Sequence, residues 1–393
     1  MSARVLGSRY DVVVAGARCA GAATAMLLAR QGLRVLVVDR GQYGTDTLST
    51  HALMRGGVVK LHHWGLLGAL EIEATPSVHS TSFHYGEREV RIPIKVRDGI
   101  PGLFAPRRIV LDRLLVDAAG DAGAEVAYGL RVADLVRTAE GRVAGVVVED
   151  GNGQVVQVAA DTVVGADGLR STVARLAAVE PYRTGQHASA VVYGYFSGLA
   201  LDGFHWHFRP GVSAGRLPTN DGLTCVFAAT SDRRFRDEVS RDVASGFTRV
   251  LAECAPELAA RVAAAPRSGS LRGFAGQVGF LRRPWGPGFA LVGDAGYFKD
   301  PITAHGITDA LRDAELAASA IATGSERALA AYHERRDELA LGLFEISDRI
   351  ASFEWSLPAV EKLHLALSEE MKREVAAMAE PRERLGEPTR LSA

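Results

Sequence analysis

The amino-acid sequence predicts a mixed α/β fold, α+β overall: a parallel-sheet domain assembled from separate chain segments, an antiparallel-sheet domain and a C-terminal helical segment. Three observations predict it. A strand, a glycine-containing turn, a helix and a second strand follow one another near the start of the chain. Two further strands end in turns of glycine and aspartate far downstream, and a run of short strands separates these two. Because the glycine turns have to meet in space, the first domain is expected to be discontinuous in sequence.

The first pattern is a βαβ unit. It predicts strands over residues 11–15 and 34–38, joined by a helix over residues 22–30, with Asp39 and Arg40 at the end of the second strand. In Rossmann-like domains the first turn holds a pyrophosphate at a helix N-terminus, and an acid after the second strand binds the adenosine ribose. We therefore expect a dinucleotide here, with Asp39 on its ribose.

The turn of this unit lacks one of its usual glycines. Gly16 and Gly21 frame the turn, but Arg18, next to Ala17, stands at the position of the middle glycine. That glycine normally lets the backbone approach the pyrophosphate. Two interpretations stay open: the phosphate lies slightly further out, or the Arg18 guanidinium contacts it directly.

Two later strands end in similar turns. One leads to Asp167 and Gly168, and the other, over residues 288–292, leads to Gly293 and Asp294 and then into a long helix. An aspartate at the end of a buried strand can accept hydrogen bonds from a polyol, and a helix N-terminus carries free N–H groups and a positive partial charge. These two features suit the ribityl chain and the reduced ring of a flavin, which indicates FAD.

The motifs resemble those of the flavoprotein monooxygenases of the para-hydroxybenzoate hydroxylase fold, a superfamily that also holds geranylgeranyl reductase-like enzymes and flavin-dependent halogenases. The resemblance covers roughly residues 9–340. Residues 55–58 resemble the family's Arg-Ala-Gly-Val, and Arg108 with Leu111 resembles its Arg-x-x-Leu. The glycine–aspartate motif aligns without a gap but departs from the family at five positions: Gly296 and Tyr297 replace Ala-His, Ala304 and His305 replace Gly-Gln, and Thr308 replaces Asn.

The resemblance, together with the turns, implies an FAD site. Pro301 would shape the turn beside the flavin ring, and the helix that begins near Gly306 would stabilise the negative charge of the reduced ring. The expected cofactor-binding residues are Gly16, Ala17, Arg18, Gly21, Asp39, Arg40, Arg55, Gly56, Arg108, Asp167, Gly168, Gly293, Asp294, Pro301, Ala304, His305 and Gly306.

The resemblance also implies a chemistry. NAD(P)H would reduce FAD, oxygen would add to the reduced flavin, and the C4a-hydroperoxide would hydroxylate a medium-sized aromatic or polycyclic molecule. The sequence shows no second βαβ fingerprint, which fits NAD(P)H as a transient co-substrate. Two alternatives stay open. One is an FAD-dependent C=C reductase of the geranylgeranyl reductase type, which the departures at Gly296, Tyr297 and His305 allow, and the other is a non-catalytic flavin-binding sensor.

The residues that would set substrate choice are candidates only. Tyr193 and Tyr195 share one face of a predicted strand, and His205 and His207 share one face of another, but which faces point inward is open. The competing interpretation is that the tyrosines pack within the sheet in the ordinary way and that the histidines are exposed to solvent. For His305, the alternatives are a local hydrogen-bond partner and a titrating group beside the flavin. The candidate catalytic residues are His51, Tyr193, Tyr297, Lys299 and His305.

No metal is expected. His205 and His207 have the spacing of metal ligands on a strand, but the sequence offers no third ligand nearby. The three cysteines, Cys19, Cys225 and Cys254, are too few and too scattered for a disulfide framework or a metal cage.

Composition restricts the partners. The chain has 393 residues, with 45 Lys and Arg against 46 Asp and Glu, and the charges are interspersed, so no basic stripe invites nucleic acid. No apolar run reaches the ~18–20 residues of a membrane span. The first residues lead directly into the nucleotide strand without a signal peptide, so a cytoplasmic enzyme is expected. Its partners would be a small aromatic substrate and O2, with a homodimer possible.

The motifs also suggest domain boundaries. The charged helical C-terminal segment carries no catalytic motif and is interpreted as a cap or an oligomer contact. The predicted segments are 1–75, 100–178 and 270–335 for the FAD domain, 76–99 and 179–269 for the substrate domain, and 336–393 for the C-terminal segment.

Overall fold

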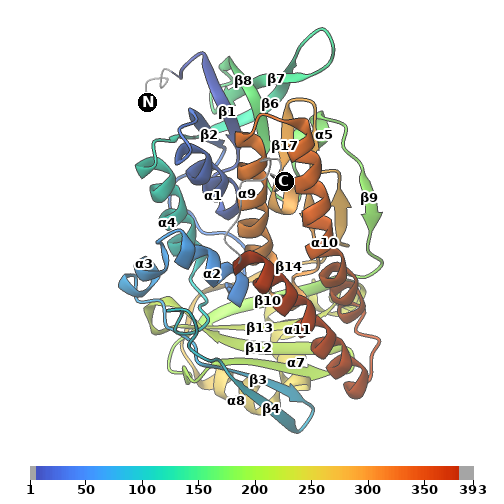
Figure 1. The fold of residues 1–393 in the computed structure, drawn as a ribbon. Helices are drawn as coiled ribbons and strands as arrows, with labels where there is room; N and C mark the ends of the chain where they lie inside the picture. Colours follow the sequence, from blue (N-terminus) through green and yellow to red (C-terminus); the bar gives the residue numbers. More distant parts are fainter. Residues whose placement is uncertain (1–5, 380–393) are drawn as a thin grey trace, which may run out of the picture.

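The computed structural model describes residues 6–379, and two large sheets dominate it. The first sheet occupies one end of the molecule and the second the other, while long C-terminal helices run between them (Figure 1). Among the described residues, no helix is both long enough and apolar enough to cross a membrane.

The first sheet has eight strands in the order β16-β17-β8-β1-β2-β5, with β6 and β7 extending it from β8. Ala15 pairs in parallel with Val38 on one side and Gly165 on the other, and Gly165 pairs with Leu291. The four strands therefore end at one edge of the sheet. The strands are β1 (Arg9–Ala15), β2 (Val35–Asp39), β5 (Glu125–Tyr128), β6 (Leu130–Arg137), β7 (Val143–Asp150), β8 (Val155–Gly165), β16 (Trp285–Gly286) and β17 (Phe289–Leu291).

This register confirms the discontinuous Rossmann-like fold. It brings together the turns after β1, β2, β8 and β17, which lie far apart in the sequence. Alternate residues of β1 face two cores: Val12 and Val14 pack against one face with the helices, and Val13 packs against the other with β6 and β7. The helices around this sheet are α1 (Cys19–Ala29), α2 (Arg55–His63), α3 (Leu67–Ile72), α4 (Arg108–Asp121), α5 (Thr172–Leu176) and α9 (Gly306–Ala322).

The second sheet has seven strands in the order β14-β10-β13-β12-β11-β3-β4. All its pairs are antiparallel except β11 with β3, which is parallel. The boundary predicted between residues 269 and 270 falls inside β14. The strands are β3 (Ser80–Tyr85), β4 (Arg88–Pro93), β10 (Ser189–Phe196), β11 (Phe204–Arg209), β12 (Val212–Pro218), β13 (Thr224–Ser231) and β14 (Arg267–Phe274).

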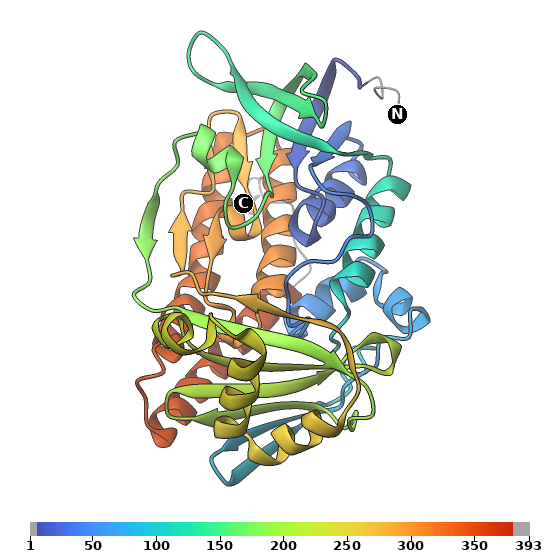
Figure 2. The same ribbon diagram turned by 180° about the vertical axis from the view of Figure 1, so that it is seen from behind.

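The two faces of the second sheet have different neighbours. Tyr193, Tyr195 and Trp206 face the core that the sheet shares with the first domain, whereas Val192 and Phe196 face the helices behind it. Figure 2 shows α7 and α8 over this outer face. The segments of the outer layer are η1 (Asn220–Gly222), α6 (Asp232–Arg234), the π-helical turn η2 (Phe235–Val239), α7 (Val243–Cys254) and α8 (Pro256–Ala264).

The C-terminal helices fold back on the chain itself. The last described helix contacts α10 and also α2, which lies beside the nucleotide turns. The described part of the predicted C-terminal segment therefore packs on its own chain, and its roles as a cap or an oligomer contact stay predictions. Residues 380–393 lie outside the described part. The remaining elements are α10 (Glu326–Ala351), α11 (Leu357–Ala379), the 3-10 turns η3 (Gly293–Ala295) and η4 (Pro301–Thr303), and a small sheet of β9 (Pro181–Thr184), β15 (Phe280–Arg282) and β18 (Tyr297–Phe298).

A buried ionic network joins α9 to α11. The guanidinium of Arg312, which is fully buried, lies 2.9 Å from Asp309, 2.8 Å from Asp313 and 2.6 Å from Glu374 on α11. His305 Nε2 lies 2.8 Å from the same Glu374 carboxylate, and its Nδ1 faces Asp309 at 3.3 Å. Burying charges is costly, so each member depends on its partners to offset its lost hydration.

We predict that Glu374→Gln destabilises the protein strongly. The amide removes one of the three carboxylates around Arg312 and one of the two that face His305 in a buried site, and removing one member of a buried ion pair costs about 3–5 kcal/mol. Chemical denaturation would measure the loss. Glu369→Gln is the matched control, because Glu369 lies on the same helix in an exposed pair with Lys372 and should cost under about 1 kcal/mol. Equal effects of the two substitutions would contradict a stabilising network.

Candidate functional site

The glycine turn after β1 is closed by contacts that only glycine allows. Gly16 has a φ of +104°, and a Cβ there would lie 2.4 Å from the Ala166 carbonyl oxygen. A Cβ on Gly21 would lie 1.9 Å from the Gly16 carbonyl oxygen. The turn therefore packs directly onto the end of β8, which explains why both glycines are needed in the nucleotide motif.

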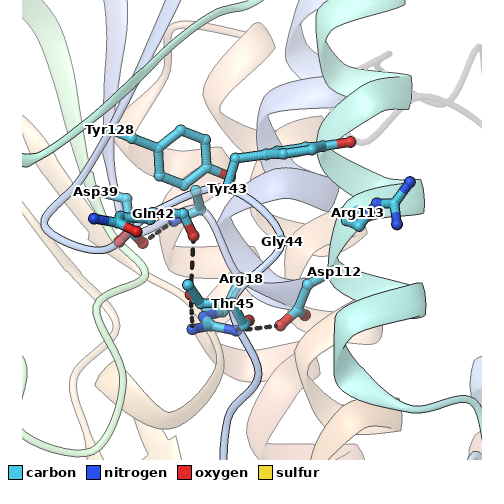
Figure 3. Close-up of a pocket in the computed structure, with 10 residues that line it drawn as sticks. Arg18, Asp39, Gln42, Tyr43, Gly44, Thr45, Asp112, Arg113 and Tyr128 are labelled. Atoms are coloured by element: carbon cyan, nitrogen blue, oxygen red, sulfur yellow. Dashed lines mark hydrogen bonds and ion pairs between the residues drawn. The ribbon is translucent and has the colours of Figure 1, made fainter.

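Asp39 is held beside this turn by two backbone groups. Its carboxylate accepts hydrogen bonds of 2.7 Å each from the Ala17 and Gly41 N–H groups. Each oxygen keeps lone pairs, so the predicted contact with an adenosine ribose stays compatible with the geometry. A pocket opens at this point (Figure 3), lined by Ala17, Arg18, Asp39, Gln42, Tyr43, Gly44, Thr45, Asp112, Arg113 and Tyr128.

Arg18 lies at the floor of this pocket. Its guanidinium donates to the Asp112 carboxylate at 2.9 Å and to the Thr45 carbonyl oxygen at 2.7 Å (Figure 3). Asp112 also accepts from Arg108 at 2.9 Å. One carboxylate thus orients two of the four arginines that the sequence assigned to the cofactor, and the two interpretations of Arg18 both remain predictions. Sequence reasoning missed Asp112, although its spacing of four residues from Arg108 on a helix was a usable signal.

The turn after β8 uses its aspartate locally. Asp167 accepts hydrogen bonds from the Ser171 hydroxyl at 2.5 Å and from the Thr172 N–H at 2.6 Å, which fixes the start of α5. Gly168 follows with a φ of +80°. The side chain of Asp167 therefore holds the shape of the turn, and its predicted contact with the cofactor stays a prediction.

Asp294 occupies the turn after β17, directly across the sheet edge from the β1 turn. Gly293 before it has a φ of +57°, and a Cβ there would lie 3.0 Å from Ala20 at the start of α1. Burial, with the nearby Asp309 carboxylate adding to it, raises the pKa of Asp294 to about 6, although Arg108 opposes the shift. A partly buried acid of this kind gains stability from hydroxyl partners, which a ribityl chain would offer.

The start of α9 follows the same turn and has free donors. Its first turn carries no side-chain cap. Ala304, which replaces a family glycine, adopts a φ of +52°, so the backbone keeps the glycine conformation at a cost in strain. Thr308 Oγ1 and Arg55 Nη1 are buried without a hydrogen-bond partner in the described part of the chain. These unpaired atoms and donors near the turns fit FAD as the missing ligand.

Arg55 and Gly56 begin α2, whose N-terminus packs against α9. Arg55 donates to the Lys95 carbonyl oxygen at 2.6 Å, and a Cβ on Gly56 would lie 2.9 Å from Thr308. The small residue therefore lets α2 approach α9 closely. The other predicted cofactor residues lie close to the turns described above. Arg40 directly follows β2, Pro301 begins η4, and Gly306 begins α9.

His51 and Tyr193 lie together where the first domain meets the inner face of the second sheet. His51 is 1% exposed and has a φ of +69°, a strained conformation for a residue with a side chain. Its Nε2 shares a hydrogen bond with the Tyr195 hydroxyl, and the two rings stack with centroids 5.6 Å apart. Tyr193 accepts a hydrogen bond from the Ser49 N–H at 3.1 Å. His51 Nδ1 is buried without a partner among the described residues.

The pair of His51 and Tyr195 is neutral near pH 7. Burial lowers the pKa of His51 well below its usual value, and Arg108 and Arg107 lower it further. Burial also raises the pKa of the Tyr195 hydroxyl. Both shifts move the pKa values away from pH 7, so Tyr195 is a weak acid and His51 a weak base, and the hydrogen bond between them holds the Tyr195 hydroxyl in a fixed position.

The other three candidates lie elsewhere: Lys299 and His305 belong to the buried ionic network, and Tyr297 lies beside it. Lys299 forms an ion pair with Asp309 and lies 3.1 Å from His305 Nδ1. Burial opposes a charge on His305, but the Glu374 carboxylate outweighs this and raises the pKa of His305. Tyr297 points into a separate core, with its hydroxyl 3.4 Å from the Ala340 carbonyl oxygen. The structure does not bring these three residues to His51 and Tyr193.

We predict a pH dependence of stability that belongs to His51. Its folded-state pKa lies below 6.5, so below that pH the unfolded chain binds a proton that the folded chain does not. Unfolding becomes easier by about 1.4 kcal/mol per pH unit as the pH falls from 6.5 toward the folded-state pKa. Denaturation of wild type and His51→Gln at pH 8 and pH 5.5 should show a smaller acid loss in the variant. The exposed His79→Gln is the control, and an unchanged acid loss in His51→Gln would contradict the assignment.

Comparison with known proteins identifies the family. A family profile described as an FAD binding domain matches residues 9–347. The menaquinone reductase of Mycolicibacterium smegmatis is 28% identical over 348 residues, which covers 81% of this chain and 78% of the relative. Digeranylgeranylglycerophospholipid reductase 2 of Methanothermobacter thermautotrophicus is 30% identical over 338 residues and covers 80% of each chain.

Solved structures share the whole fold. The flavin-dependent brominase Bmp2 superposes with a TM-score of 0.75 at 20% identity, covering 94% of this chain and 93% of the other. PqsL of Pseudomonas aeruginosa, bound to 2-aminobenzoylacetate, superposes with a TM-score of 0.73 at 23% identity, covering 94% and 99%. The chain therefore belongs to the FAD-binding domain family and is an FAD-dependent oxidoreductase of the para-hydroxybenzoate hydroxylase-like fold.

Proposed function

We propose that this oxidoreductase reduces a C=C bond in an apolar, prenyl-type substrate. The observation that carries the proposal is the similarity to whole reductases: relatives at 28% and 30% identity over about four-fifths of both chains are named for the reduction of menaquinone and of a digeranylgeranyl lipid. The structural neighbours named as halogenases or linked to monooxygenation are below 25% identical, so they support the fold alone. The sequence motifs by themselves favour hydroxylation over C=C reduction, so the comparison with relatives reverses the ranking of these two functions.

The lining of the interdomain core supports an apolar substrate. The inner face of the second sheet is rich in aromatic and aliphatic side chains, and Phe208 on this face packs against Trp355 and against His364 of α11. A hydrocarbon chain entering there would meet surfaces of matching polarity. The residues that give the face this character are Phe204, Trp206, Phe208, Leu217, Leu223 and Phe227.

The polar groups in this core suit the proton side of a reduction. When bound and reduced by NAD(P)H, FAD would supply the hydride equivalent, and the neighbouring carbon needs a proton. We assign that proton to the Tyr195 hydroxyl, which is held by its hydrogen bond with His51 Nε2, and a proton from solvent would replace it after the transfer. Tyr193 would orient the substrate beside them. Lys299 and His305 would instead stabilise the start of α9, and Tyr297 would support α10.

Hydroxylation of an aromatic substrate remains the second candidate. The observation that favours it is the same pair, since a tyrosine bonded to a neutral histidine can also accept the proton of a phenol. NAD(P)H would be the transient reductant in both cases. The non-catalytic flavin sensor is the third possibility, and it predicts no turnover with any reductant.

Turnover with and without oxygen separates these functions. We predict that the FAD-loaded protein oxidises NAD(P)H or a chemical reductant under anaerobic conditions when given a prenylated quinone or lipid. The product should be heavier by two hydrogen atoms, as read by mass spectrometry. A product heavier by one oxygen atom, formed only in air from an aromatic substrate, would replace reduction by hydroxylation. Protein without FAD is the control for background oxidation.

Asp294→Ala should lose FAD while the chain still folds. The substitution removes the carboxylate that we expect to hold the ribityl hydroxyls, and losing a hydrogen-bonded charged partner costs about 1.5–3 kcal/mol of binding. Flavin absorbance of the purified protein and circular dichroism would measure both properties. Asp161→Ala, at an exposed position on β8, should purify with the wild-type flavin content. A fully flavin-loaded Asp294→Ala protein would show that this residue does not hold the cofactor.

A further inference from the structure

Three strands at one edge of the second sheet bring together residues that lie far apart in sequence. β3 pairs with β4 so that His84 is opposite Glu89, and it pairs in parallel with β11 so that His84 is opposite His207. His205 precedes His207 by two residues and therefore points to the same side. The topology thus supplies the partner that the sequence around His205 and His207 lacks.

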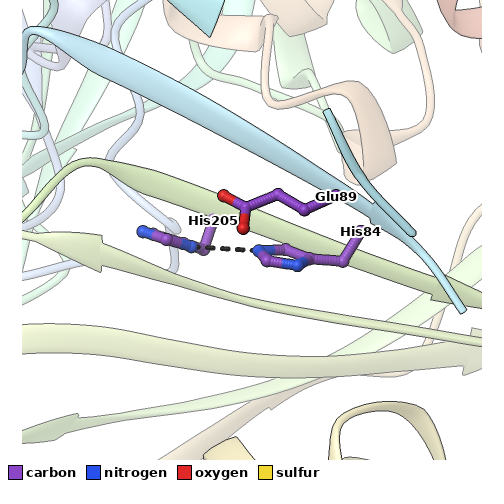
Figure 4. Close-up of side chains that lie close together, drawn as sticks. All are labelled: His84, Glu89 and His205. Carbon is purple, nitrogen blue, oxygen red and sulfur yellow. Dashed lines mark hydrogen bonds between the residues drawn. The ribbon is translucent and has the colours of Figure 1, made fainter. Parts of the chain in front are cut away.

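The side chains of His84, Glu89 and His205 converge on one point (Figure 4). His84 Nε2 lies 3.1 Å from His205 Nδ1, and one ligand atom each from His84, Glu89 and His205 lies within 4.8 Å of the other two. The separation of the two nitrogens is close to that of ligands around a single small cation with bonds of about 2.0–2.2 Å, and the exposed Glu89 side chain can close on the same point. Two imidazole nitrogens and a carboxylate oxygen form a donor set that zinc accepts.

The second nitrogen of His205 has its own partner. His205 Nε2 faces Asp202 Oδ1 at 3.4 Å, and Asp202 is held in turn by Arg216 at 2.6 Å. A carboxylate on the far nitrogen fixes the orientation of a metal-binding histidine and increases its basicity. The ring of His207 stacks on His84 with centroids 4.1 Å apart, which holds the His84 ring in place.

The chemistry of the three side chains suits a cation, because neutral imidazole and ionised carboxylate are the forms that bind a metal ion.

Other charges around the cluster are mixed. Arg216 on β12 is the nearest cation and is neutralised by Asp202. Glu257 on α8 adds a negative potential at His84, and Arg91 on β4 adds a positive one at Glu89. A hydrogen bond between His84 and His205 is enough to explain the 3.1 Å between their nitrogens. The β3–β4 register places Glu89 beside the same two rings, which gives the pair of histidines a third donor.

We propose that His84, His205 and Glu89 form a binding site for a divalent transition metal ion of the zinc class, with water completing the coordination. The site lies on the face of the sheet opposite Tyr193 and Tyr195 and takes no part in the flavin chemistry. It ties the β3–β4 hairpin to β11 and stabilises this edge of the sheet.

The test uses FAD-loaded, metal-free protein from which any histidine tag has been removed. Titration with Zn²⁺ against a chromogenic chelator should show one bound ion per chain. His84→Gln and His205→Gln should each weaken this binding at least tenfold, on the order of the effect of losing a metal-orienting group. Wild-type protein that binds no Zn²⁺, or variants that bind it as tightly as wild type, would overturn the proposal.

Two further variants keep the result interpretable. Glu89→Gln changes an exposed side chain, so the protein should fold, and it should also lower Zn²⁺ affinity. His79→Gln removes an exposed histidine just before β3, whose Nδ1 faces the Pro101 carbonyl oxygen, and it should bind Zn²⁺ as wild type does. Added Zn²⁺ should raise the thermal midpoint of wild type and of His79→Gln, but not of the other variants. Loss of affinity in His79→Gln alone would place the bound ion elsewhere and sink the assignment.

Discussion

The fully buried guanidinium of Arg312 is the contact on which the arrangement of the cofactor domain depends. It binds carboxylates from its own helix and from α11, so two helices at opposite ends of the C-terminal region share one charge. Leaving any of these groups unpaired in the interior costs more than the pair itself contributes. α11 is therefore not a free appendage: it is fixed against α9 at the point where α9 begins, and through α9 it fixes the turn that carries Asp294.

The same network sets the electrostatics near the flavin. Lys299, Arg312 and a protonated His305 face the carboxylates of Asp309, Asp313 and Glu374. When His305 is protonated, the positive and negative groups balance, and the uncapped first turn of α9 is left as the source of positive potential. Deprotonation of His305 would leave an excess negative charge beside that turn, which opposes a reduced, anionic flavin. The raised pKa of His305 favours its protonated form and so keeps the electrostatic potential at the first turn of α9 positive.

The sequence predicts those parts of the site that follow from strand ends. Parallel strands place the turns after them at one edge, so the neighbourhood of Gly16, Asp39 and Asp294 follows from local motifs. Alternation places Tyr193 and Tyr195 on one face, but only the packing against the first domain decides that this face is buried. Glu374 could not be predicted, because it lies 62 residues from Arg312 in a helix with no motif. Only tertiary contacts reveal such partners.

Strand β11 shows how one segment can serve two purposes. Phe204, Trp206 and Phe208 face the interdomain core, and His205 and His207, which alternate with them, face the opposite side. A restraint on the histidine side therefore acts on the backbone that positions the aromatic side chains. Because the two faces share no atoms beyond that backbone, a metal bound on one face would influence the position of the aromatic side chains on the other face without touching them. Changes on the histidine face should accordingly alter stability and substrate affinity before they alter the proton-donating pair.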